Sequence, residues 1–167
     1  NIMYSGAPAG GLWKSTNSGT SWTTNTDQLA VIGCTDVAID PTNTNIMYLA
    51  TGDGDAQDTY SVGVLKSTDG GVTWNTTGLN WTASQGRSIS RLLINPSNTQ
   101  ILLAATSIGI ERTTDGGTTW SVATGTSGVN YKDMEFRPSD PTTIYACGTT
   151  FWKSTNSGSS FTNITSG

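Results

Sequence analysis

The sequence contains no histidine, only two cysteines, and no apolar run long enough to cross a bilayer. The absence of histidine excludes histidine-based catalytic triads and histidine-ligated metal sites within these residues. A membrane-spanning helix needs about 20 consecutive apolar residues, so no membrane insertion is expected. Two cysteines do not make a disulfide framework, so Cys34 and Cys147 are expected to be small buried thiols.

Charged residues are also scarce, and the basic ones are the scarcest. Lys and Arg number 8 against 12 Asp and Glu, which gives a net charge of -4. Phosphate binding requires a basic surface, so no nucleic-acid partner is expected. Much of the chain is Thr, Ser, Asn and Gly, but its six Trp and regular apolar runs argue against disorder. This mixture favours short strands joined by many turns.

One eight-residue pattern, S/T-T-D/N-x-G-x-S/T-W/F, occurs four times, and we call it the box. Its copies are residues 15–22, 67–74, 113–120 and 154–161. Each box follows a short strand that ends in a base, which itself follows an apolar strand. In three units a strand closed by proline comes first, and the box aromatic opens a last strand. Four strands in about 40 to 50 residues are typical of a β-propeller blade.

The pattern predicts an all-β chain, with residues 1–167 forming a single β-propeller segment of four-stranded antiparallel blades. The approximate blade boundaries are 1–30, 31–80, 81–126 and 127–167. The first unit lacks its proline-closed strand, so fifteen strands make about 3.75 blades. Because rings contain about four to eight blades, we expect an arc of a larger ring. The alternative is a four-bladed ring closed by residues outside this chain, so the expected partners are further blades of the same precursor or a partner chain.

The boxes are predicted to be structural turns. Their Asp or Asn should accept hydrogen bonds from turn amides, and their glycine should take a positive φ. Asn in two of the four copies argues against a catalytic carboxylate, because Asn cannot transfer a proton. The bases before the boxes should lie along their strands with their charged heads in water. The structural set is Asn17, Asp69, Asp115 and Asn156, with Trp22, Trp74, Trp120 and Phe161 as apolar plugs between sheets.

The box resembles the Asp-box, or bacterial neuraminidase repeat. Together with the proline-closed strands and the spacing, it resembles the sortilin-like and xyloglucanase-like propellers of large secreted bacterial proteins. This resemblance covers almost the whole chain and implies a secreted or cell-surface propeller. The xyloglucanase-like resemblance implies a catalytic Asp near the first blade, but the corresponding residues 4–11 contain no acid. The segment does not contain a complete set of catalytic residues.

An acidic insertion in the second unit is the first candidate site. It brings together Asp53, Asp55 and Asp58, with a glycine between the first two. Hard oxygen ligands on a pliable backbone suit Ca²⁺, so this loop is the candidate metal site and Ca²⁺ the candidate cofactor. The alternatives are a solvated acidic loop and a catalytic carboxylate.

Two further sets of residues are candidate ligand contacts. Trp81, outside the box pattern and accompanied by Gln85 and Arg87, either stacks on a sugar ring or packs on the neighbouring blade. Asp36, Arg91 and Asp133 take the same position in three successive inner strands. They either pair with one another at the channel mouth or orient a polar ligand.

These features favour a binding or scaffold module, adhesin-like, secreted or on the cell surface. A rigid ring with variable loops is all that this function requires. The alternative is a part of a propeller glycoside hydrolase or carbohydrate-binding protein that acts on polysaccharide. A peptide receptor of the sortilin type is a further possibility. The expected external partners are polysaccharide or a surface protein.

Overall fold

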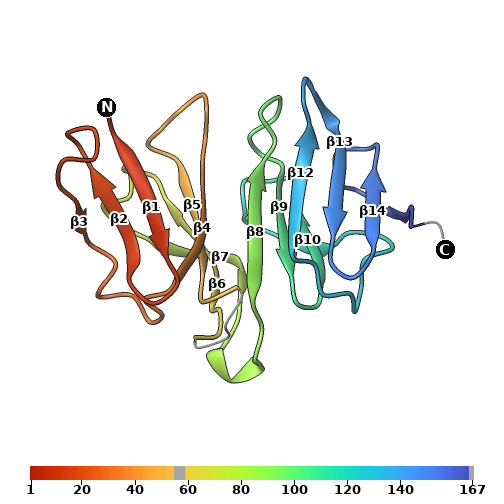
Figure 1. Ribbon diagram of the computed structural model, residues 1–167, viewed down its shortest axis with the longest axis horizontal. Helices are drawn as coiled ribbons and strands as arrows, with labels where there is room; N and C mark the ends of the chain where they lie inside the picture. The colour runs from red at the N-terminus through yellow and green to blue at the C-terminus, as the bar shows by residue number, and fades with distance from the viewer. Residues whose placement is uncertain (55–58, 166–167) are drawn as a thin grey trace.

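The computed structural model describes residues 1–54 and 59–165, which form an all-β structure (Figure 1). This described part contains fifteen strands and one turn of 3-10 helix, η1 at Ala83–Gln85. Consecutive strands pair antiparallel into one three-stranded and three four-stranded sheets. The expected set of three complete units and one that lacks its first strand is confirmed. Among the same residues, no helix is long and apolar enough to cross a membrane.

The sheets follow one another along the chain, and each keeps its strands in sequence order. The strands are β1 Met3–Ala7, β2 Gly11–Ser15 and β3 Thr23–Thr24; β4 Cys34–Ile39, β5 Met47–Thr51, β6 Gly63–Ser67 and β7 Asn75–Asn80; β8 Ile89–Ile94, β9 Leu102–Thr106, β10 Gly109–Thr113 and β11 Ser121–Val122; β12 Asp133–Arg137, β13 Asp140–Cys147, β14 Phe151–Ser154 and β15 Thr162–Asn163.

The hydrophobic cores lie between neighbouring sheets. Every residue of β5 and of β9 is buried. Because both faces of these strands are covered, their sequences are continuous apolar runs rather than alternating ones. Met47, Leu102 and Ile144 are fully buried, and each belongs to a cluster shared with the preceding sheet. Three hydrophobic clusters therefore join the four sheets into one arc.

The box aromatics contribute to the same clusters. Trp74, Trp120 and Phe161 each pack against the cluster between their own sheet and the preceding one. Phe161 is buried, whereas the two tryptophans are half-buried. Trp22, in the first sheet, is half-buried, and its indole donates a hydrogen bond to its own box at Gly19 O, 3.1 Å away.

Each box is a closed turn with the same internal hydrogen bonds. In the second copy, the Ser67 hydroxyl donates to Asp69 Oδ1 at 2.7 Å, and the Gly71 amide donates to Ser67 Oγ at 2.9 Å. Asp69 also accepts from the Thr73 amide at 2.9 Å. Between the two side chains, the Thr73 hydroxyl donates to Asp69 Oδ2 at 2.6 Å, whereas in the Asn boxes the direction reverses and Asn156 Nδ2 donates to Ser160 Oγ at 2.9 Å. A hydroxyl can donate or accept, and this is why Asp and Asn are interchangeable here.

The fourth and fifth residues of every box have positive φ. The fifth is always glycine, as predicted, with φ of 88° at Gly19 and 76° at Gly158. The fourth is glycine in the Asp boxes but serine in the Asn boxes, where Ser18 and Ser157 have φ of 58° and 55°. A left-handed residue other than glycine costs roughly 1 to 2 kcal/mol, so the box network must hold these serines in place.

The bases before the boxes join one sheet to the next. Lys14 Nζ donates to Gly70 O at 3.2 Å, and Lys66 Nζ donates to Gly116 O at 2.9 Å. Arg112 Nε donates to Ser157 O at 2.9 Å. In all three cases the acceptor is the carbonyl of the fourth residue of the following box. The expectation that these heads lie in water is therefore wrong for three of the four bases, because a turn carbonyl of the next sheet lies within reach.

We call each of these contacts a joint, and the two lysine joints have a tyrosine as a supporting partner. Tyr4 and Tyr48 stand opposite Lys14 and Lys66 in the strand register. Their hydroxyls donate to the same carbonyls, Gly70 O at 3.2 Å and Gly116 O at 3.0 Å. Each lysine Nζ also lies over its tyrosine ring, 5.4 and 5.3 Å from the centroid. The third joint has Leu103 opposite Arg112 and lacks the hydroxyl.

We predict that alanine substitutions at two box glycines lower the free energy of unfolding by different amounts, one through backbone strain alone and the other through strain and a steric clash. Gly19→Ala should cost about 1 kcal/mol, because φ is positive and only Met3 and Trp22 atoms of its own unit lie near, at 3.7 Å or more. Gly158→Ala should cost about 1 to 3 kcal/mol more, because a Cβ there would lie 2.1 Å from Leu103 Cδ2 of the preceding sheet. Urea unfolding of the two variants measures this difference. Equal losses would contradict the packing of boxes onto preceding sheets.

We also predict that the two Asp boxes make stability depend on acid pH. Hydrogen bonds from the Thr73 hydroxyl and amide lower the pKa of Asp69 to about 2 from 3.8, and those from Thr119 lower the pKa of Asp115 to about 2 in the same way. A lowered folded pKa gives stability that is present above the unfolded pKa and lost as pH falls toward the folded one.

The wild-type chain should therefore lose more stability between about pH 4 and about pH 2 than the double variant Asp69→Asn, Asp115→Asn, which reproduces the natural Asn boxes. Urea midpoints across this window measure the two slopes. Parallel slopes would show that the box carboxylates do not carry the effect.

Candidate functional site

The inner strands of three successive sheets carry charged residues at one level. β4, β8 and β12 lie side by side along the arc (Figure 1). Asp36 in β4, Arg91 in β8 and Asp133 in β12 occupy equivalent positions in the registers of their sheets. Arg91 stands on the middle strand and therefore has an acidic residue on each side.

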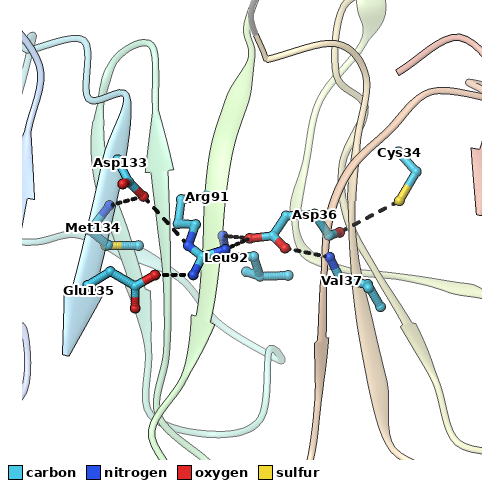
Figure 2. A network of polar contacts seen from close by, with 8 residues as sticks. All are labelled: Cys34, Asp36, Val37, Arg91, Leu92, Asp133, Met134 and Glu135. Carbon is cyan, nitrogen blue, oxygen red and sulfur yellow. Dashed lines mark hydrogen bonds and ion pairs between the residues drawn. The ribbon is translucent and has the colours of Figure 1, made fainter. Parts of the chain in front are cut away.

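Arg91 contacts three carboxylates, as Figure 2 shows. Its Nη1 lies 3.4 Å from Asp36 Oδ2, and its Nε lies 3.6 Å from Asp133 Oδ1. Its Nη2 is bonded to Glu135, two residues farther along β12. The four side chains, which we call the inner ion cluster, tie together three inner strands that are distant in sequence.

Asp36 is the most enclosed acid of the inner ion cluster. Its two carboxylate oxygens accept hydrogen bonds from the Val37 and Leu92 amides, both at 2.8 Å. Burial raises the pKa of Asp36 above its usual value, while the Leu92 amide and Arg91 act in the opposite direction. Both oxygens of the Asp36 carboxylate are therefore hydrogen-bonded to the protein, and Asp36 has a structural role.

Cys34 borders the same cluster. Its thiol donates a long contact of 3.8 Å to Asp36 O (Figure 2). Burial, helped by the negative charge of Asp36, raises the pKa of Cys34 to about 12, so the thiol is not a nucleophile at neutral pH. Both cysteines are free, but Cys147 is only half-buried, which corrects the expectation of two buried thiols.

A hollow of about 340 Å³ opens beside the inner ion cluster. It is bordered by residues that immediately precede the charged ones, Thr35, Ser90 and Lys132, and by Pro8 and Gly54. Lys132 is the charged residue of this lining, and the acids of the neighbouring inner ion cluster are engaged with Arg91.

The acidic insertion lies only partly within the described residues. Asp53 is buried, and its amide donates to Thr59 O at 2.8 Å. Asp55 and Asp58 lie outside the described residues. In the part of the chain that the structure describes, no group of three Asp, Glu, Cys or His side chains could hold a metal ion. The Ca²⁺ site at Asp53, Asp55 and Asp58 thus stays a prediction.

Trp81 directly follows β7, where the chain passes from the second to the third sheet. The connection from β7 to β8 lies at the bottom of Figure 1. Its ring is half-buried against the cluster between these sheets. The Arg87 guanidinium lies 5.3 Å from the ring centroid. Gln85 has a local task, because its Oε1 accepts a hydrogen bond from the Thr82 amide at 2.9 Å and so caps η1. The structure therefore brings Trp81 and Arg87 into contact, whereas the Gln85 side chain caps η1.

A second hollow, of about 490 Å³, includes Trp81 in its wall. We call it the tryptophan hollow. Its apolar residues include Trp74, Trp81 and Leu29, and its polar residues include Gln28 and Asn80, whose Nδ2 donates to Thr77 O at 3.0 Å. Aromatic rings beside a few amides are the common composition of sites for small polar ligands with apolar faces.

Comparison with known proteins identifies the fold. No protein-family model matches the sequence, and no curated protein matches it. Among solved structures, the chain is similar to an ancestral GH74 enzyme over 99% of its length, with a TM-score of 0.79 and 23% identity. It is also similar to the GH74 enzyme of Niastella koreensis, with 98% of the chain covered, a TM-score of 0.72 and 27% identity. The chain has a β-propeller fold.

A third propeller neighbour is the GH74 xyloglucanase of Xanthomonas campestris, matched over 98% of the chain with a TM-score of 0.72 and 20% identity. The chain spans 22% of the ancestral enzyme and 28% of each of the other two. Each sheet is thus a blade, and four successive blades correspond to about a quarter of such an enzyme.

Sequence reasoning missed two residues of these sites, Glu135 and Gln28, and the buried Glu111 near Arg87. Glu135 stands two positions after Asp133, and alternation along a strand would have placed both on one face. Glu111, in the third blade, is buried, and burial raises its pKa while the charge of Arg87 opposes the rise. No sequence pattern around Gln28 indicates a site, because its place in the tryptophan hollow depends on how the first blade packs on the second.

We predict that Arg91 is a structural link between blades. Arg91→Gln should lower the free energy of unfolding by roughly 1 to 3 kcal/mol, between the effects of exposed and buried pairs, because the enclosed Asp36 loses its counter-charge. The control is Arg137→Gln, whose pair with Asp140 is exposed and 3.8 Å long, and which should cost less than about 0.5 kcal/mol. Thermal and urea unfolding measure both. Similar losses would refute the special place of Arg91.

Proposed function

We propose that this chain is a polysaccharide-binding segment of a propeller, which holds a glucan-type chain at the tryptophan hollow without hydrolysing it. The observation that carries the proposal is the composition of that hollow: two tryptophans, with the amides of Gln28 and Asn80 beside them. Sugar rings offer apolar faces to aromatic rings and hydroxyls to amides, so these residue types match both requirements.

The likeness to GH74 enzymes supports the same class of ligand. One of the three neighbours is a xyloglucanase, and 98% of this chain matches 28% of that protein. Fold alone does not assign function, so the site must carry the argument. We further propose that the segment acts outside the cell or on its surface, as a scaffold that presents its loops to glycan.

The described acids favour binding over hydrolysis. A glycosidase needs two carboxylates that flank the scissile bond. Asp36, Asp133 and Glu135 all contact the one guanidinium of Arg91. The competing function, a glycoside hydrolase, rests on Asp53, which is a buried carboxylate next to Gly54 in the wall of the smaller hollow.

Calorimetric titration with soluble xyloglucan oligosaccharides tests the proposal. We expect binding that Gln28→Ala weakens roughly three- to tenfold, through the loss of one hydrogen bond. Trp81→Ala should weaken it at least about tenfold through the loss of a stacking surface. Tyr60→Ala, which removes an exposed ring outside the hollow, should leave affinity unchanged.

Because Trp81 also packs in a core, thermal melting of Trp81→Ala must accompany its titration, whereas Gln28 is exposed and needs no such correction. Absence of binding, or binding indifferent to both variants, would contradict the proposal. Release of reducing sugar that Asp53→Asn abolishes would favour the hydrolase instead.

A further inference from the structure

The six tryptophans of the chain differ in what their indole N–H groups contact. Four of them donate this group to an oxygen of the protein, and these are Trp13, Trp22, Trp120 and Trp152. Within the described residues, the indole N–H groups of Trp74 and Trp81 donate to no protein atom. These two are the tryptophans that line the tryptophan hollow. The unused donors therefore gather at one place.

Trp74 differs from the other box tryptophans in one hydrogen bond. In the first and third boxes the indole N–H donates to the carbonyl of the fifth box residue, at 3.1 Å in both. In the second box that carbonyl, Gly71 O, accepts from Asn25 Nδ2 of the first blade at 2.6 Å. Trp74 Nε1 is buried and has no partner in the described part of the chain. A buried N–H without an acceptor costs free energy, which a ligand oxygen would recover.

Trp81 has a fixed ring and a free N–H. Its backbone amide donates to Val62 O at 3.0 Å, and the Arg87 guanidinium lies 5.3 Å from its ring centroid. The nearby Asn80 Nδ2, by contrast, already donates to Thr77 O at 3.0 Å. A side chain that is held before binding loses little further freedom when a ligand arrives.

We propose that the indole N–H groups of Trp74 and Trp81 bind oxygen atoms of the ligand in the tryptophan hollow. The proposal rests on the proposed function and names the groups that select its ligand, a ring with an apolar face and acceptor oxygens at its edge. A site built to hydrogen-bond such oxygens discriminates against a ligand that lacks them, because its donors then stay unpaired. An oxygen reaches the buried Trp74 Nε1 when the ring turns, and no hydrogen bond to its own box opposes this turn.

Heteronuclear NMR of the indole N–H groups tests the proposal on the 167-residue chain. Soluble xyloglucan oligosaccharides should shift the resonances of Trp74 and Trp81 and leave those of Trp22 and Trp120 in place. Binding that leaves the first two resonances unmoved would overturn the inference while the proposed function stands. Absence of any binding would overturn both.

A substitution that removes one N–H and keeps an aromatic ring gives the second test. Trp74→Phe reproduces the natural Phe161 of the fourth box, so the fold accommodates it. Calorimetric titration should show affinity for the oligosaccharides about three- to tenfold weaker, through the loss of one hydrogen bond. The control is Trp22→Phe, which lies outside the hollow and should leave affinity unchanged. Wild-type affinity in Trp74→Phe would refute the role of this donor.

Thermal melting of the free protein tests the unpaired state of Trp74. Trp120→Phe removes the same atoms together with a hydrogen bond of 3.1 Å, whereas Trp74→Phe removes no hydrogen bond. The melting temperature of Trp120→Phe should therefore lie below that of Trp74→Phe. The reverse order, or equal melting temperatures, would show that the Trp74 indole already has a partner in the free protein, and the proposal would fail.

Discussion

The structure depends on one repeated contact, the hydrogen bond from the base of one blade to the box carbonyl of the next. The four short sheets share no single large core but have a separate hydrophobic cluster at each interface. The contacts at each interface must therefore fix how two neighbouring blades pack. The joint does this with one lysine or arginine and one turn carbonyl, beneath which an apolar cluster is buried. The hydrogen bonds inside each box hold its left-handed residues in place, and the same turn supplies that carbonyl.

The box turns and the joints lie at one end of the strands, so the loops at the other end can differ from blade to blade. The second blade carries both the acidic insertion and the connection with Trp81, and neither is needed for the turns or joints. The inner ion cluster around Arg91 adds a second link between blades at the inner strands. A rigid frame with irregular loops on one side suits the binding of an extended ligand.

The fold was readable from the sequence because its signals are local. In each unit the apolar strand, the base and the box follow one another in the same order along the chain, so their phase gave the strand count. Contacts between blades were not readable in this way. The acceptor of Lys66 lies fifty residues away at Gly116, and nothing near Lys66 indicates it. The place of Gln28 in the tryptophan hollow was unreadable for the same reason, because tertiary packing brings it there. Glu135 was readable in part, because strand alternation places it on the face of Asp133.

The most direct test compares a lysine inside a joint with one outside. Lys66 and Lys153 both lie over a tyrosine ring, but among the described residues Lys66 donates to a carbonyl of the following blade and Lys153 to none. Urea unfolding is measured on Lys66→Met and Lys153→Met at concentrations where the chain is monomeric. The account predicts a loss of about 1.5 to 3 kcal/mol for Lys66→Met, the range for a hydrogen bond to a charged group, and less than about 0.5 kcal/mol for Lys153→Met. Equal losses would show that the joint does not hold the blades together.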